Sequence, residues 1–168
     1  QKCLLPDMKE KQLASINFIH YNAPNASEQF EEKLRETRSV DKHSIFIVDE
    51  IHEFINTVFS NIRNDRGRAR RIYDKIMQEL KRDKHTRVIT LSATPVVKEP
   101  FELALLFNML QPNLFPTDPD DFDDIFIKNK MLSAKAKNLF MRRILGKVSY
   151  FKGHTADTYA TQKNYLIE

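Results

Sequence analysis

The stretch SIFIVDEIH, residues 44–52, decides the fold that this sequence predicts. Its four consecutive apolar residues, 45–48, are typical of a strand that is buried on both faces, as in parallel sheets. Two carboxylates, Asp49 and Glu50, follow at once, and the burial of an unpaired charge is costly. We therefore expect both acids to emerge at the carboxyl end of the strand, where open α/β sheets bind their ligands.

A second strand of the same kind is predicted at residues 87–91 (RVITL), directly before Ser92 and Thr94. Ser92 lies 43 positions after Asp49, which is ample for a helical crossover between two parallel strands. Both strands would then end at one edge of the sheet, with their loops facing each other. In that arrangement the hydroxyls of Ser92 and Thr94 could hydrogen-bond to a carboxylate or to His52.

Apolar spacing predicts the other elements of an α/β domain. Amphipathic periodicity predicts helices at residues 27–37, 51–62, 72–84, 101–110 and 132–145. Short alternating stretches predict further strands at residues 16–21 and 148–151. We expect connections in the arginine-rich run 63–71 and in the proline- and acid-rich run 111–124.

The composition is that of one soluble domain. The chain has 168 residues, of which 41% are hydrophobic and 30% are charged. No apolar run approaches the ~20 residues that cross a bilayer, and the charged start does not resemble a signal peptide. The single Cys3 suits a reducing, intracellular compartment. A net charge of +4 permits a polyanionic partner without requiring one.

Glycine is too scarce for a phosphate-binding loop. Such a loop needs the pattern G-x-x-x-x-G-K-[ST], and the chain has only three glycines. Only Gly146 precedes a lysine, and the position five before it is Met141. Either the acids do not serve a nucleotide, or the chain is a fragment of a longer protein. The missing initiator methionine favours a fragment.

The acid pair suits magnesium-dependent phosphoryl transfer. Asp49 could hold Mg²⁺, mostly through water, while Glu50 orients or deprotonates the attacking water. The alternative is a pair of surface acids just past a strand. Likewise, Ser92 and Thr94 could instead cap a following helix, and a lone His52 in a first helical turn is often a surface residue. A zinc role is poorly supported, because no metal-ligand spacing repeats.

Two tetrapeptides resemble motifs of a known superfamily. DEIH (49–52) and SATP (92–95) resemble motifs II and III of superfamily 2 helicases and translocases, and residues 91–112 resemble the Swi/Snf-type branch. Three stretches are similar to nucleoside triphosphatase I and related D/E-x-H helicases of large cytoplasmic DNA viruses, namely YNA (21–23), VDEIHEF (48–54) and RRILGKVSYFKG (142–153).

The resemblance implies an α/β fold and a division of the chain. It implies a partial RecA-like lobe, with a mainly parallel sheet flanked by helices, and a helical connection toward a second lobe. Residues 1–127 would form part of the first ATPase lobe, lacking the P-loop. Residues 128–168 would contain the inter-lobe helix and the start of the second lobe.

The resemblance also implies roles for the site residues, with ATP and Mg²⁺ as cofactors. Asp49 would hold Mg²⁺ through water, and Glu50 would be the catalytic base. His52 would couple the site to the other lobe. Ser92 and Thr94 would lie at the nucleotide site and link hydrolysis to strand movement.

These implications lead to a functional expectation. The chain would belong to an ATP-dependent helicase or translocase that acts on nucleic acid, with DNA favoured over RNA, in the host cytoplasm or the virion. Its partners would be nucleic acid, the second RecA-like lobe and the viral transcription machinery, and no membrane. Without the P-loop and the arginine finger, the isolated chain would be inactive. The alternatives are a non-catalytic interaction module with the fold of an ATPase lobe, and another P-loop NTPase such as a restriction or packaging motor.

Overall fold

The computed structural model describes residues 16–39, 43–62, 67–93, 98–128 and 131–150. Their regular elements are, in chain order, α2 (Ala26–Ser39), β1 (Ile45–Val48), α3 (Ile51–Ser60), α4 (Arg68–Arg82), β2 (Arg87–Thr90), α5 (Pro100–Leu110), α6 (Pro119–Phe126), β3 (Ile127–Lys128), β4 (Met131–Leu132) and α7 (Ala134–Ile144). A small parallel sheet flanked by helices confirms the expected fold class, that of part of an α/β RecA-like lobe.

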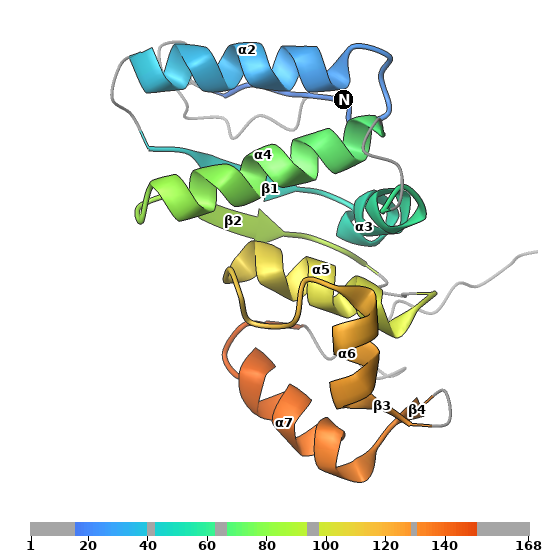
Figure 1. The fold of residues 1–168 in the computed structure, drawn as a ribbon. Helices are drawn as coiled ribbons and strands as arrows, with labels where there is room; N and C mark the ends of the chain where they lie inside the picture. Colours follow the sequence, from blue (N-terminus) through green and yellow to red (C-terminus); the bar gives the residue numbers. More distant parts are fainter. Residues whose placement is uncertain (1–15, 40–42, 63–66, 94–97, 129–130, 151–168) are drawn as a thin grey trace, which may run out of the picture.

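The parallel pair β1–β2 is the centre of the first half of the molecule. Ile45 is in register with Arg87, and Val48 is in register with Thr90. Helices α3 and α4 form the crossover between the two strands, as the spacing predicts. Figure 1 shows α2 and α4 above and in front of the strands, and α5 below them.

Only one face of this sheet is covered by the described residues. Phe46, Val48 and Val88 pack against the core, and Phe46 lies on Phe30 of α2 with ring centroids 5.6 Å apart. On the opposite face the apolar side chains are 48–66% exposed, namely those of Ile45, Ile47, Ile89 and Leu91. The prediction that both strands are buried on both faces is therefore wrong for this part of the chain, because the helices that the structure describes pack on one side.

The helices follow their apolar periodicity closely. In α3 the buried side chains recur at helical spacing, as predicted: Ile51, Phe54, Ile55 and Val58. Phe30 and Leu34 form the buried stripe of α2. Helix α4 begins earlier than expected, at Arg68, so part of the arginine-rich run predicted as a connection is helical.

Two further expectations for local structure are wrong. Residues 16–20 form no strand, and Phe18 is 80% exposed. An alternating pattern makes a strand only if it pairs with a neighbouring strand, and residues 16–20 pair with no strand of either described sheet. Residues 148–150 likewise have no regular structure, and residue 151 lies outside the described part of the chain.

The second half packs around a cluster of aromatic rings. Helix α6 begins within the run 111–124, which the sequence predicts to be a connection, and extends to Phe126. Asp118 caps this helix by accepting hydrogen bonds from the backbone N–H groups of Asp120 and Asp121. Helix α7 confirms the helix predicted at 132–145, although β4 takes its first position. Rings from α5, α6, α7 and the intervening loop contact one another, namely those of Phe107, Phe115, Phe122, Phe126 and Phe140.

Candidate active site

The loops that follow β1 and β2 meet at the carboxyl end of the sheet. The Leu91 N–H donates to the Val48 carbonyl at 2.9 Å, which continues the ladder beyond the last strand pair. The Ile51 N–H then donates to the Leu91 carbonyl at 3.0 Å. These two bonds place the DEIH and SATP tetrapeptides side by side at their first residues, as the parallel arrangement of the strands predicts.

His52 contacts Ser92 directly across these loops. Its Nδ1 atom lies 2.8 Å from the Ser92 hydroxyl oxygen, and its side chain is only 18% exposed. The hydroxyl can donate or accept, so the contact suits either tautomer of the ring. The structure therefore joins two predicted site residues that lie 40 positions apart in the sequence.

The imidazole of His52 also lies between two carboxylates. Glu50 Oε2 is 3.3 Å from Nδ1, and Glu53 Oε1 is 3.6 Å from Nε2. Glu53 was not among the predicted site residues. Its position three residues after Glu50, in the first turn of a helix, is the signal that could have identified it.

The backbone is strained at Glu50. This residue precedes α3 with φ 47° and ψ 50°, a left-handed conformation that few residues other than glycine adopt. Its N–H donates to Asp49 Oδ1 at 3.0 Å, and its own side chain makes no capping bond to the helix. Strained conformations of this kind cluster at functional sites. The turn leaves both carboxylates exposed at the end of the strand.

This arrangement fits magnesium better than zinc. Among the described residues, no group of three or more His, Cys, Asp or Glu side chains could hold a metal ion. Zinc sites need three or four protein ligands. Magnesium commonly takes one or two carboxylates and completes its coordination with water and phosphate oxygens. Asp49, exposed and with one oxygen in the turn, fits that requirement.

Tyr21 also lies close to the acids, although its sequence position gave little sign of it. Its ring meets Phe54 edge to face, with centroids 5.3 Å apart. Partial burial raises the pKa of the Tyr21 hydroxyl, and the negative charges of Glu53 and Glu50 raise it further. The match of YNA (21–23) to viral proteins was the only signal in the sequence.

Two other candidates contribute less. Thr94 lies outside the described residues. In the arginine-rich run, Arg70 pairs with Asp74 at 3.0 Å and Arg71 lies 3.9 Å from Glu28. These pairs on a helix surface favour the interpretation of residues 67–71 as a solvated helical face rather than a phosphate site.

No helix in the described part of the chain has the length and apolar character that a membrane span requires. No protein-family model matches the sequence. Individual proteins of large DNA viruses do match it.

The chain is 43% identical over 153 residues to a protein of Acanthamoeba polyphaga mimivirus that is named as an ATP-dependent RNA helicase. The matched region covers 89% of the chain and 19% of that protein. It is 33% identical over 107 residues to a termination factor NPH-I homolog of African swine fever virus, covering 63% of the chain and 14% of the relative. Nucleoside triphosphatase I of Melanoplus sanguinipes entomopoxvirus is 24% identical over 148 residues, or 86% of the chain and 22% of the relative.

The chain thus spans about a fifth of the length of these relatives or less. The chain is therefore a homologue of one segment of viral proteins named as ATP-dependent helicases, NPH-I termination factors and nucleoside triphosphatases.

Proposed function

We propose that this chain supplies the catalytic acids of an ATP hydrolysis site in a helicase or translocase that acts on nucleic acid. The contact that supports this most strongly is the one between His52 and Ser92, 2.8 Å long, because it links the loops of two parallel strands beside two exposed acids. An acid pair that served only as a solvated surface would need no such link.

The proposed roles follow from the position of each group. Asp49 would hold Mg²⁺ through water, and the chemistry that Mg²⁺ would supply there is neutralisation of charge on the phosphate oxygens. Glu50, beside His52, orients the water that attacks the terminal phosphate. Glu50 and Ser92 both contact Nδ1 of the His52 imidazole, so the ring can couple the acid to the loop after β2.

The wider assignment rests on the relatives. Their names support nucleic acid as the partner, and we favour DNA over RNA and a Swi/Snf-like translocase that works in viral transcription. We propose residues 1–127 as part of the first ATPase lobe and residues 128–168 as the connection to a second lobe. A P-loop and an arginine finger from other parts of the polypeptide would complete the site.

The test is ATP hydrolysis by the complete gene product, measured with and without double-stranded DNA, single-stranded DNA or RNA. Glu50→Gln should lower the rate by ~10²–10⁴-fold, the loss typical of a positioned general base. Glu32→Gln is the matched control, since it removes the same charge from an exposed position on α2 and should leave the rate unchanged. If Glu50→Gln hydrolyses ATP as fast as the unmodified protein, Glu50 is not the base. If the unmodified protein shows no hydrolysis, the chain is an interaction module instead.

A further inference from the structure

Glu102 is a buried carboxylate in the apolar helix α5. It is 1% exposed, between Phe101 and a run of buried apolar residues. Burial of a carboxylate is costly unless its oxygens are hydrogen-bonded. Packing alone would favour an apolar side chain at this position, so the charge must serve the contacts that it makes.

Both carboxylate oxygens of Glu102 are used, and they hold two different segments. Oε1 accepts a hydrogen bond from Asn56 Nδ2 on α3 at 3.2 Å. Oε2 accepts one from the backbone N–H of Lys98 at 3.3 Å, just before α5 begins. The Lys98 ammonium closes the set by donating to Asn56 Oδ1 at 3.1 Å. We call Asn56, Lys98 and Glu102 the polar clamp.

The polar clamp shares a face of α3 with the site. Asn56 lies four residues after His52, so both side chains project from one side of the helix. His52 contacts Ser92, and Asn56 contacts the segment again at Lys98 and Glu102. Helix α3 therefore contacts the polypeptide between β2 and α5 at two described points, one on each side of residues 94–97.

From this geometry we propose that Asn56 and Glu102 are positioning residues, which hold the start of α5 on α3 so that Ser92 stays on His52. This inference rests on the proposed function. It goes beyond that function by assigning a part in coupling to α5, a helix that carries none of the proposed nucleotide-site residues. Loss of the polar clamp would free the far end of the segment and loosen the contact between His52 and Ser92.

A reciprocal exchange tests the polar clamp. The double variant Asn56→Asp/Glu102→Gln places the amide at position 102 and the carboxylate at position 56. The amide can donate to the carboxylate and accept from the Lys98 backbone N–H. The carboxylate stays paired with the Lys98 ammonium. In Asn56→Asp alone, two carboxylates face each other. In Glu102→Gln alone, the two amides can satisfy each other only if Asn56 turns its Nδ2 toward the Lys98 ammonium. Both single variants should therefore disturb the site, and the double variant should restore it.

Two measurements on the complete gene product decide the outcome. The first is the ratio of nucleic-acid-stimulated to basal ATP hydrolysis, which should fall by about tenfold in each single variant, the equivalent of one hydrogen bond to a charged group. The second is the NMR chemical shifts of the His52 imidazole protons at one fixed pH, which should change in both single variants because the ring no longer rests on Ser92. The double variant should return the hydrolysis ratio to within about twofold of the unmodified protein, and the His52 ring resonances to their original positions.

Other results would overturn the inference. If the single variants lower the melting temperature but change neither readout, Glu102 is only a structural acid. Failure of the double variant to restore the readouts would also overturn it. Lys98→Met, an exposed change that removes only the ammonium, provides a milder variant if the others do not fold. If the unmodified protein hydrolyses no ATP, the proposed function fails, while the chemical shifts of the His52 ring still decide whether the polar clamp positions it.

Discussion

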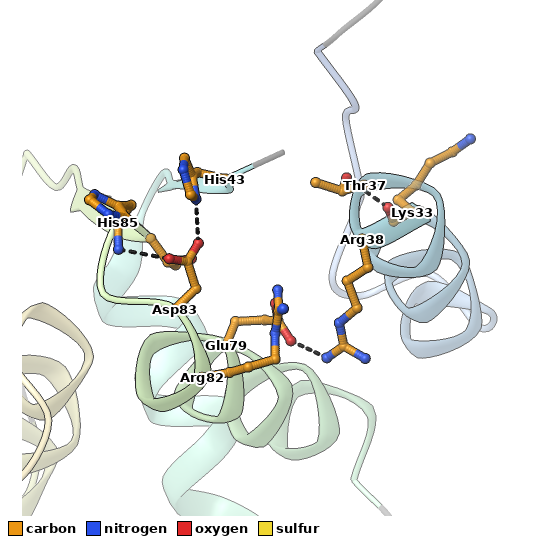
Figure 2. A network of polar contacts seen from close by, with 9 residues as sticks. Lys33, Thr37, Arg38, His43, Glu79, Arg82, Asp83 and His85 are labelled. Carbon is orange, nitrogen blue, oxygen red and sulfur yellow. Dashed lines mark hydrogen bonds and ion pairs between the residues drawn. The ribbon is translucent and has the colours of Figure 1, made fainter. Parts of the chain in front are cut away.

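The two ends of the β1–β2 sheet each bring a histidine beside acids, and they treat these acids differently. At the carboxyl end, His52 lies between Glu50 and Glu53 and contacts Ser92. At the amino end, Figure 2 shows His43 and His85 beside Asp83, with Glu79 one helical turn behind. The chemical groups are similar, so the comparison shows what distinguishes an acid that holds the fold from one that is available to a ligand.

The acids at the amino end are satisfied by the fold itself. Asp83 accepts hydrogen bonds from the His85 backbone N–H at 2.9 Å, the His43 ring at 2.8 Å and the Thr86 hydroxyl at 3.1 Å. Glu79, which is fully buried, is bonded to Arg38 and Arg82. Burial alone would raise the pKa of Glu79, but the hydrogen bonds and charges of the two arginines outweigh it and lower the pKa.

The acids at the carboxyl end have few donors. Asp49 accepts one N–H from its own turn, and the Glu50 carboxylate meets only the His52 ring among the described residues. The strained backbone of Glu50 adds a cost that folding alone would not select. Acids that are exposed and unsatisfied at the ligand-binding end of a sheet are the ones to assign to a ligand.

The largest expected effect is a loss of ATP hydrolysis without a loss of stability, at the carboxyl end of the sheet. Glu50→Gln should lower hydrolysis by ~10²–10⁴-fold and leave the free energy of unfolding within ~0.5 kcal/mol of the unmodified protein, because the side chain is exposed. Urea denaturation beside steady-state kinetics measures both. A large loss of stability would place Glu50 with the structural acids and break the comparison.

Near the amino end of the sheet we expect the reverse, namely a loss of stability without a loss of ATP hydrolysis. Arg38→Met/Arg82→Met should lower the free energy of unfolding by about 3–5 kcal/mol, because Glu79 would remain buried without its cationic partners. Hydrolysis per folded molecule should not change. Arg70→Met is the control on α4, where the surface pair with Asp74 should contribute less than ~1 kcal/mol. Equal losses in both variants would contradict the role of Glu79.

Relief of backbone strain should produce a smaller change of opposite sign. Glu50→Gly suits the left-handed conformation and should raise the free energy of unfolding by about 1 kcal/mol, while hydrolysis is lost with the carboxylate. Chemical denaturation of this variant beside Glu50→Gln separates the backbone effect from the loss of charge. A destabilised Glu50→Gly variant would mean that the conformation carries no strain.

The smallest effect concerns pH. The His85 backbone N–H, and then the His43 ring, lower the pKa of the Asp83 carboxyl to about 2. Its pKa in the unfolded chain is about 3.9. The folded value is the lower one, so this contribution to stability is fully present above about pH 4 and is lost as the pH falls toward 2.

Asp83→Asn should therefore flatten the fall of the urea midpoint across this acidic range, and its stability at pH 7 should be lower than that of the unmodified protein. Midpoints measured at several pH values for both proteins test this. An unchanged slope in Asp83→Asn would show that other carboxylates cause the acid sensitivity.

Local patterns in the sequence predict those parts of the molecule that depend on local physics. The apolar spacing of α3 and the lengths of β1 and β2 follow from periodicity, and the contact between His52 and Ser92 follows from two parallel strands that share an edge. Helix α6 was missed although Asp118 and Pro119 carry a start signal, because the acids around them read as a connection.

Long-range features could not be predicted in this way. Whether a strand has one or two covered faces depends on which layers pack against it, and the pattern of β1 is the same in both cases. The contact between Asn56 and Glu102 joins residues 46 positions apart, and it depends on the packing of α3 on α5. The left-handed turn at Glu50 also has no signal in the residue type, since glycine is the usual choice there.

The uncovered face of the sheet has a practical consequence for anyone who produces this chain alone. Four aliphatic side chains face outward there, and within the described part of the chain each strand of the pair has one outer edge without a ladder partner. Such edges are the surface that recruits strands from other molecules. Copies of the chain produced alone should therefore associate with one another at high concentration. Poor solubility under those conditions would result from this surface rather than from a failure to fold.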